Sequence, residues 1–96
     1  MDTYVILRRD AWGSPEELEQ AAARSKQVGD EEMADDIRWI RSYVVSQPGR
    51  RLGTVCIYEA SSPDAIRDHA NRVGMPASEV MPVLDTVVVR PDPAAA

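Results

Sequence analysis

The segment 37–59, IRWIRSYVVSQPGRRLGTVCIYE, constrains the fold of this chain more than any other stretch. Two runs rich in valine, isoleucine, tyrosine and tryptophan flank the sequence QPGRR. Such side chains favour β-strands because they fit a pleated surface. Pro48 presets φ and Gly49 tolerates positive φ, so the pair is typical of a turn. The segment therefore predicts a β-hairpin of two long antiparallel strands.

Two segments share one pattern of helix initiation. Each has a capping serine, then proline at the first helical position, then acidic residues: SPEE at 14–17 and SPD at 62–64. Apolar and small residues follow at helical spacing and predict one buried face for each helix. Because the first of these faces is rich in alanine, we expect that helix to pack close to the sheet. The predicted helix ends are Gly29 and Gly74. The inward positions are Leu18, Ala21, Ala22, Ser25 and Val28 in the first helix, and Ile66, Ala70 and Val73 in the second.

Two further apolar runs complete the predicted sheet. Residues 4–8 form the first strand and residues 86–89 the last, with a turn and a short helical piece over 75–80. The order β-α-β-β-α-β is that of a ferredoxin-like α+β fold, in which two helices cover one face of a four-stranded antiparallel sheet. We expect a single domain over residues 1–90 and a flexible C-terminal tail over 91–96.

The predicted strands carry apolar side chains at successive positions, as in VCIY at 55–58. Because the side chains of a strand alternate between the two faces of a sheet, both faces are apolar. The helices cover only one of them, and large exposed apolar patches are rare on monomers. We therefore expect a homodimer in which the open sheet faces of two chains pack together.

Composition excludes several classes of protein. The net charge is -5 and the arginines are dispersed, whereas a nucleic-acid partner requires a basic patch. No apolar run approaches the roughly 20 residues of a membrane span, so we expect no membrane partner. The N-terminus lacks the basic segment of a signal peptide, and the single cysteine, Cys56, fits a reducing compartment. These features predict a cytoplasmic protein.

The chain contains no catalytic or metal-binding motif of fixed spacing. The single histidine, His69, flanks the buried stripe of the second helix, and Glu59 ends the third predicted strand. An imidazole and a carboxylate together bind transition metals or act as an acid–base pair. A helix histidine that hydrogen-bonds a neighbour and a solvent-facing glutamate are the structural alternatives.

Aromatic residues of the hairpin are candidates to line a pocket. They are Trp39, Tyr43 and Tyr58, and the even spacing of Trp39 and Tyr43 predicts that these two share one face. Aromatic side chains with polar tips are typical of small-molecule sites. They are also enriched in cores and at dimer interfaces, which remains the alternative.

The remaining reactive side chains have simpler interpretations. Cys56 has no neighbouring cation in the sequence, so we expect a core residue rather than a reactive thiol. Arg9 and Asp10 predict a surface ion pair, with binding of an anion as the alternative. The acidic segment 30–36, DEEMADD, lacks the ligand spacing of a calcium loop and predicts a solvated connection.

Four runs of the sequence resemble a known family: IRWIRSYV at 37–44, CIYEA at 56–60, SPDAIRDHA at 62–70 and GMPA at 74–77. The chain resembles the nickel-binding-protein-like family of small bacterial proteins, known largely as a domain of unknown function, from residue 4 to about residue 89. The resemblance implies a ferredoxin-like fold, usually a dimer, and Ni²⁺ as the candidate metal. The motif residues that it carries over are Trp39, Ser42, Tyr43, Tyr58, Glu59 and His69.

Three functions follow from these considerations. The first is a small nickel-binding protein with His69 and Glu59 as ligands. The second is a cofactor-independent enzyme of the dimeric α+β barrel type that acts on a small organic molecule. In it His69 is the base, Glu59 orients the base, and Tyr43 or Tyr58 donates to a developing oxyanion. The third is a dimeric accessory module without chemistry of its own.

Overall fold

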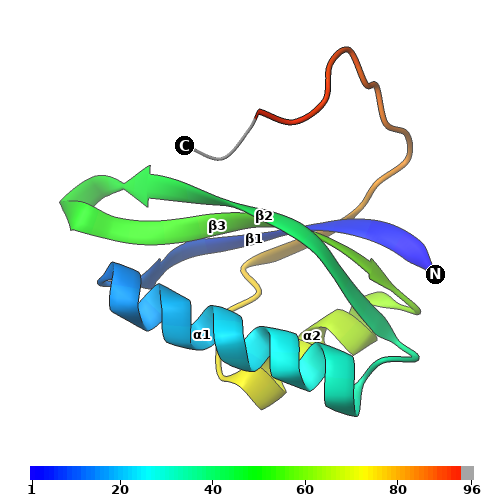
Figure 1. Cartoon of the computed structure of the whole chain (residues 1–96), viewed down its shortest axis with the longest axis horizontal. Coiled ribbons are helices and arrows are strands. Elements are labelled where there is room, and N and C mark those ends of the chain that lie inside the picture. The colour runs from blue at the N-terminus through cyan, green and yellow to red at the C-terminus, as the bar shows by residue number, and fades with distance from the viewer. Residues whose placement is uncertain (94–96) are drawn as a thin grey trace.

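The computed structural model describes residues 1–93, in which two helices pack on one face of a four-stranded sheet (Figure 1). The strands lie in the order β2-β3-β1-β4, and every neighbouring pair is antiparallel. This arrangement confirms the predicted ferredoxin-like α+β fold. The elements are β1 (Asp2–Trp12), α1 (Pro15–Gln27), a π-helix (Val28–Glu32), β2 (Ile37–Gln47), a 3-10 helix (Pro48–Arg50), β3 (Arg51–Ala60), α2 (Pro63–Val73) and β4 (Glu79–Pro82).

Both helices begin where the Ser-Pro pattern predicts. The side chain of Ser14 accepts a hydrogen bond from the backbone N–H of Glu17 at 3.2 Å, and that of Ser62 accepts one from Ala65 at 3.1 Å. These bonds satisfy backbone donors that have no partner within the first helical turn. Gly74 ends α2 as predicted, with a φ of 85° that favours glycine.

The predicted end of α1 at Gly29 is wrong. The backbone N–H of Val28 still bonds to carbonyls of the preceding turn, and the chain continues without a break into the π-helix Val28–Glu32. Val28 and Gly29 are both buried there. Packing of this turn against the core therefore prolongs the helix into the first residues of the acidic segment, which was predicted to be a loop.

The prediction of the last strand over residues 86–89 is also wrong. The strand β4 is Glu79–Pro82, and it pairs with β1 from Leu7 opposite Glu79 to Tyr4 opposite Pro82. The connection after α2 is short, so residues 79–82 reach the free edge of β1 before the valine run 86–89 can do so. Arg8 and Arg9 hold it there, through bonds to the backbone oxygen of Pro76 and to the carboxylate of Glu79. Position along the chain thus overrides the higher β-propensity of the valine run.

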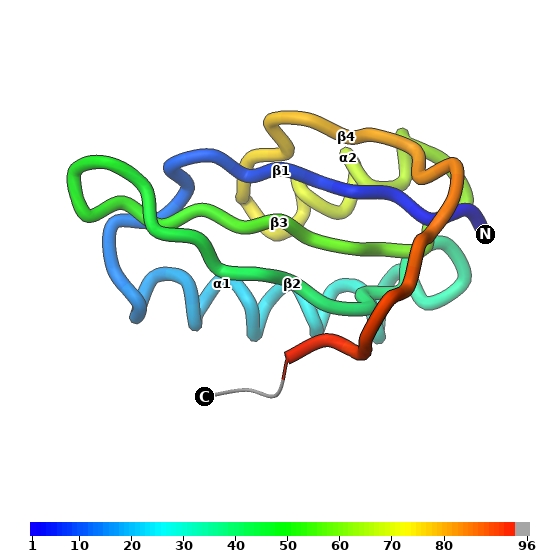
Figure 2. Tube along the Cα trace, turned by 90° about the horizontal axis from the view of Figure 1, so that it is seen from above, coloured from blue at the N-terminus to red at the C-terminus, as the bar shows by residue number. Residues whose placement is uncertain are grey.

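Residues 83–93 leave β4 and pass over the sheet face opposite the helices, from the β4 edge toward the β2 edge (Figure 2). The backbone N–H of Val83 bonds to the carbonyl of Thr3 at 2.9 Å, and Asp92 forms an ion pair with Arg41 on β2. Residues 94–96 of the predicted tail lie outside the described residues.

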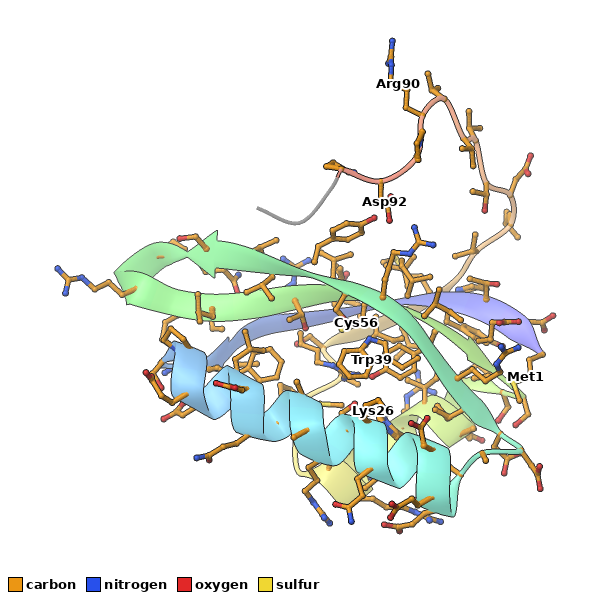
Figure 3. The ribbon with its side chains drawn as sticks, in the orientation of Figure 1. Met1, Lys26, Trp39, Cys56, Arg90 and Asp92 are labelled. Atoms are coloured by element: carbon orange, nitrogen blue, oxygen red, sulfur yellow. The ribbon has the colours of Figure 1, made fainter. Side chains whose placement is uncertain are left out.

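The core lies between the sheet and the helices. Figure 3 shows Trp39 and Cys56 in this layer, whereas Arg90 and Asp92 lie on the opposite side of the sheet. Cys56 is buried, as predicted, and its thiol donates a hydrogen bond to the hydroxyl of Thr54 at 3.2 Å. No helix within residues 1–93 has both the length and the apolar character needed to cross a membrane.

Candidate ligand-binding cavity

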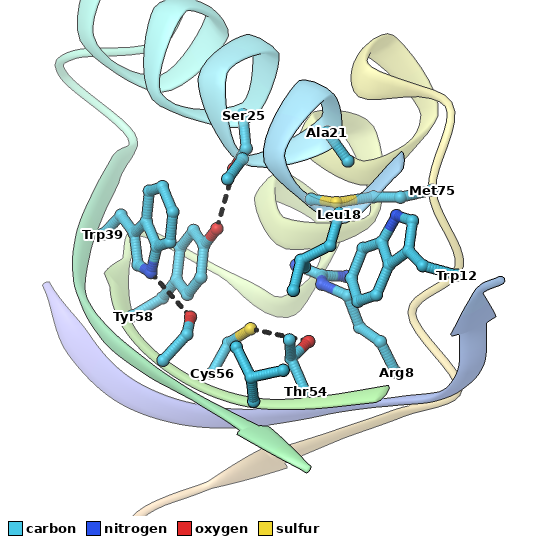
Figure 4. A pocket seen from close by; sticks show the side chains of 13 residues that line it. Arg8, Trp12, Leu18, Ala21, Ser25, Trp39, Thr54, Cys56, Tyr58 and Met75 are labelled. Carbon is cyan, nitrogen blue, oxygen red and sulfur yellow. Dashed lines mark hydrogen bonds between the residues drawn. The ribbon is translucent and has the colours of Figure 1, made fainter. Parts of the chain in front are cut away.

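A cavity of about 290 Å³ lies between α1 and the sheet (Figure 4). On the helix side its wall is formed mostly by small residues, including Ala21, Ala22 and Ser25. On the sheet side the wall includes Trp39, Cys56 and Tyr58. The small side chains of α1 leave this space beneath the helix.

Among the described residues that line the cavity, only Arg8 has a charged side chain. Only 1 % of this residue is exposed, and its Nη1 atom donates to the backbone oxygen of Pro76 at 2.7 Å. Its Nη2 atom is buried without a hydrogen-bond partner among residues 1–93. The guanidinium carbon lies 5.9 Å from the centre of the Tyr58 ring. None of the ion pairs within residues 1–93 involves Arg8.

A series of two hydrogen bonds joins the cavity wall to α2. The hydroxyl of Tyr58 lies 3.0 Å from the hydroxyl of Ser25, and Nε2 of His69 lies 3.0 Å from the Ser25 backbone oxygen. Because a carbonyl oxygen only accepts, Nε2 carries the proton, and Nδ1 is the free nitrogen of the neutral ring. Nδ1 has no hydrogen-bond partner among residues 1–93. His69 is therefore a buried helix histidine that hydrogen-bonds a neighbour.

Burial also shifts the pKa values of the two titratable side chains in this hydrogen-bonded series, His69 and Tyr58. It lowers the pKa of His69, because a charged imidazolium would lose its hydration, and the bond to the Ser25 carbonyl offsets only part of this effect. Burial raises the pKa of the Tyr58 hydroxyl, with the hydrogen bond to Ser25 again opposing the shift. Both side chains are thus favoured in their neutral forms.

The structure does not bring Glu59 and His69 together. Successive side chains of β3 alternate between the faces, so Tyr58 points to the helices and Glu59 to the open side of the sheet. There Glu59 forms an ion pair with Arg38 at 3.4 Å. Within residues 1–93 no three His, Cys, Asp or Glu side chains are grouped closely enough to hold a metal ion. The surroundings of His69 in one chain therefore do not fit a nickel site.

The prediction that Trp39 and Tyr43 share a face is wrong. The pairing of β2 with β3 shifts by one residue between Trp39 and Arg41, and this β-bulge reverses the alternation of side chains beyond it. Trp39 lines the cavity and its Nε1 donates to the hydroxyl of Ser42 at 2.8 Å. Tyr43 lines a separate groove on the open side of the sheet.

Two of the three aromatic candidates do meet at the cavity. The rings of Trp39 and Tyr58 stack with centroids 6.1 Å apart and planes inclined by 11°. Trp12 lies across the cavity from this pair (Figure 4).

Sequence reasoning missed both Arg8 and Trp12 as cavity residues. β1 runs to Trp12, beyond the predicted strand 4–8, and a bulge separates its pairing at Arg8 from its pairing at Trp12. The period of two that begins at Tyr4 and Ile6 continues to Arg8, so a charged residue in the inward register was the available signal. The predicted ion pair of Arg9 with Asp10 is not formed; Arg9 instead pairs with Glu79 at 3.3 Å.

Fold and site together define a ferredoxin-like α+β protein with an apolar cavity between its first helix and its sheet. The model of the family described as nickel responsive protein SCO4226-like matches residues 4–83, and the chain belongs to this family. A similar solved structure is the crystal structure of SCO4226 from Streptomyces coelicolor A3(2), at 20% sequence identity and a TM-score of 0.69. The match covers 88% of this chain and 99% of that chain, and at this identity it shows a common fold. No curated protein matches the chain.

Proposed function

We propose that this protein binds a small organic molecule in the cavity between α1 and the sheet. The observation that carries this proposal is a space of about 290 Å³ with apolar and aromatic walls and few polar groups. Such walls are typical of small-molecule sites. The space is about twice the ~150 Å³ of an engineered apolar cavity that takes up benzene, so it has room for an aromatic molecule larger than benzene.

Intrinsic fluorescence provides a direct test, because both tryptophans of the chain, Trp12 and Trp39, line the cavity. We expect the uncharged dye N-phenyl-1-naphthylamine to bind saturably with one site per chain and to quench tryptophan emission. Ala21→Leu fills the cavity and should weaken dye binding by at least about tenfold. Ala23→Leu adds the same side chain to the exposed side of α1 and is the matched control. Equal affinity in both variants would contradict this site.

Nickel binding is the second candidate, and membership of a nickel responsive family is the observation that favours it. In one chain the only imidazole is that of His69, and Glu59 lies across the sheet from it. A nickel site that uses His69 therefore requires further ligands, such as those of a second chain, and a local opening around the buried ring. No comparable observation favours catalysis by His69, since this side chain is not among those that line the cavity within residues 1–93.

A calorimetric Ni²⁺ titration of the untagged protein tests the second candidate. Near pH 7.5 an unperturbed histidine is mostly neutral and available to a metal. Saturable binding with a defined stoichiometry, lost in His69→Gln, would support it. Heats that are weak and do not saturate, or binding that the substitution leaves unchanged, would rule out His69 as a ligand.

We also infer that the protein forms a homodimer through the open face of the sheet. Apolar side chains on this side remain accessible, among them Ile40 and Tyr43 on β2 and Val87 and Val88 on the crossing segment. Val87 is 86% exposed and Val88 is 74% exposed, although both line the groove between the segment and the sheet. Exposed apolar surface of this kind is typical of protein interfaces.

A further inference from the structure

Arg8 is a buried cation without a counter-charge in the described part of the chain. Burial of an unpaired charge is costly, and folded proteins normally give such a group a carboxylate partner. The sequence contains 16 acidic residues, yet the ion pairs formed within residues 1–93 do not include Arg8. The guanidinium nevertheless keeps its charge in proteins. A partner from outside the chain would complete this site.

The guanidinium of this cavity residue is only partly satisfied within residues 1–93. Nη1 is engaged by the Pro76 carbonyl, whereas Nη2 is buried with no partner among residues 1–93. Arg8 lines the cavity, and Figure 4 shows it between the sheet and Leu18 of α1. Because only Nη1 is engaged, an acceptor that reaches the guanidinium from the cavity could bond to Nη2 while the contact with Pro76 is kept.

A second donor is placed beside it. Thr54 stands directly opposite Arg8 in the pairing of β1 with β3, and directly opposed side chains on one face are close neighbours. Thr54 is buried and also lines the cavity. Its oxygen accepts from the thiol of Cys56, which leaves its own O–H free to donate.

We propose that the cavity takes an amphipathic monocarboxylate, whose carboxylate binds to Arg8 and Thr54 and whose apolar body lies among the aromatic walls. This inference rests on the proposed function and adds the charge of the ligand to it. Among residues 1–93 one cation lines the cavity, so a single negative charge is matched and a dianion is not. Guanidinium groups bind carboxylates through charge-assisted hydrogen bonds that neutral ligands cannot form.

The test compares two probes of nearly equal shape, 2-naphthoate and 2-naphthamide, as competitors of N-phenyl-1-naphthylamine on the full chain. We expect the carboxylate to bind at least about tenfold more tightly than the amide. In Arg8→Met this preference should disappear, while the affinities for the dye and the amide stay within about threefold. Removal of an unpaired buried charge favours a folded variant, so Arg8→Met is expected to remain measurable.

Arg9→Met is the matched control, because it removes the same charge from the neighbouring, exposed position. It should keep the preference for the carboxylate. If the dye binds but wild-type protein does not distinguish the two probes, Arg8 does not recognise the ligand and only the proposed function stands. If Arg8→Met and Arg9→Met both retain the preference, the carboxylate binds elsewhere and the inference is overturned. If neither dye nor probe binds, the proposed function itself fails.

Discussion

The hydroxyl oxygens of Tyr58 and Ser25 lie 3.0 Å apart, so one hydrogen bond joins β3 to α1 at the wall of the cavity. Both residues are buried, with Ser25 3% and Tyr58 1% exposed. The same serine uses its backbone oxygen to hold His69 of α2. Ser25 therefore links α1 both to the sheet and to α2.

Tyr58→Phe should destabilise the fold by about 1–3 kcal/mol, because it leaves the buried hydroxyl of Ser25 without its partner. Urea unfolding measures this change. Tyr43→Phe removes the same hydroxyl from a residue that is 42% exposed, and it should alter the free energy of unfolding by less than about 0.5 kcal/mol. Similar losses in the two variants would show that the bond to Ser25 is unimportant.

The imidazole of His69 should titrate below its ordinary pKa of 6.5, since burial opposes its charged form. NMR of the untagged protein measures this without ambiguity, because the chain has one histidine. A midpoint at or above 6.5 would contradict the buried position of the ring.

The same shift predicts how stability depends on pH. A lowered pKa means that the folded chain binds this proton less readily than the unfolded chain. The contribution of His69 to stability is thus complete above its ordinary pKa of 6.5 and is lost as the pH falls toward the lowered value. Urea midpoints on either side of pH 6.5 should show a smaller acid loss in His69→Gln than in the wild type.

Gly53→Ala should destabilise the protein by about 1–3 kcal/mol through overpacking. Gly53 faces the bulge of β1, and an added Cβ would lie 2.6 Å from the backbone oxygen of Arg8 and would also collide with Gln47. Gly13→Ala is the control, since its Cβ would approach only flexible side chains of Arg51 and Glu17. Chemical denaturation compares the two; a harmless Gly53→Ala would mean that the bulge adapts easily.

Light scattering at micromolar concentration should give the mass of a dimer, because the open face of the sheet retains exposed apolar side chains. Tyr43→Glu places a charge on this face and should shift the mass toward that of a monomer. Ala23→Glu adds the same charge to the exposed side of α1 and should leave the dimer intact. A monomeric wild type would refute the interface.

Local patterns were sufficient for the order of elements, the starts of both helices, the hairpin turn and the end of α2. The Ser-Pro starts of both helices depend on side chains bonding to backbone groups three residues away, and the hairpin turn depends on Pro48 and Gly49. Such contacts act within a few residues and can therefore be predicted from a sequence. The same holds for Gly74, whose φ of 85° suits glycine.

Only the tertiary structure decided where the last strand pairs and which side chains meet at the cavity. β4 formed at Glu79–Pro82 because that segment reaches the edge of β1 first, and the valine run beyond it was left outside the sheet. One bulge in β2 sent Trp39 and Tyr43 to opposite faces. Arg8 became a cavity residue because its strand register points inward and α1 leaves space above it. These outcomes depend on how distant segments pack, which no local pattern encodes.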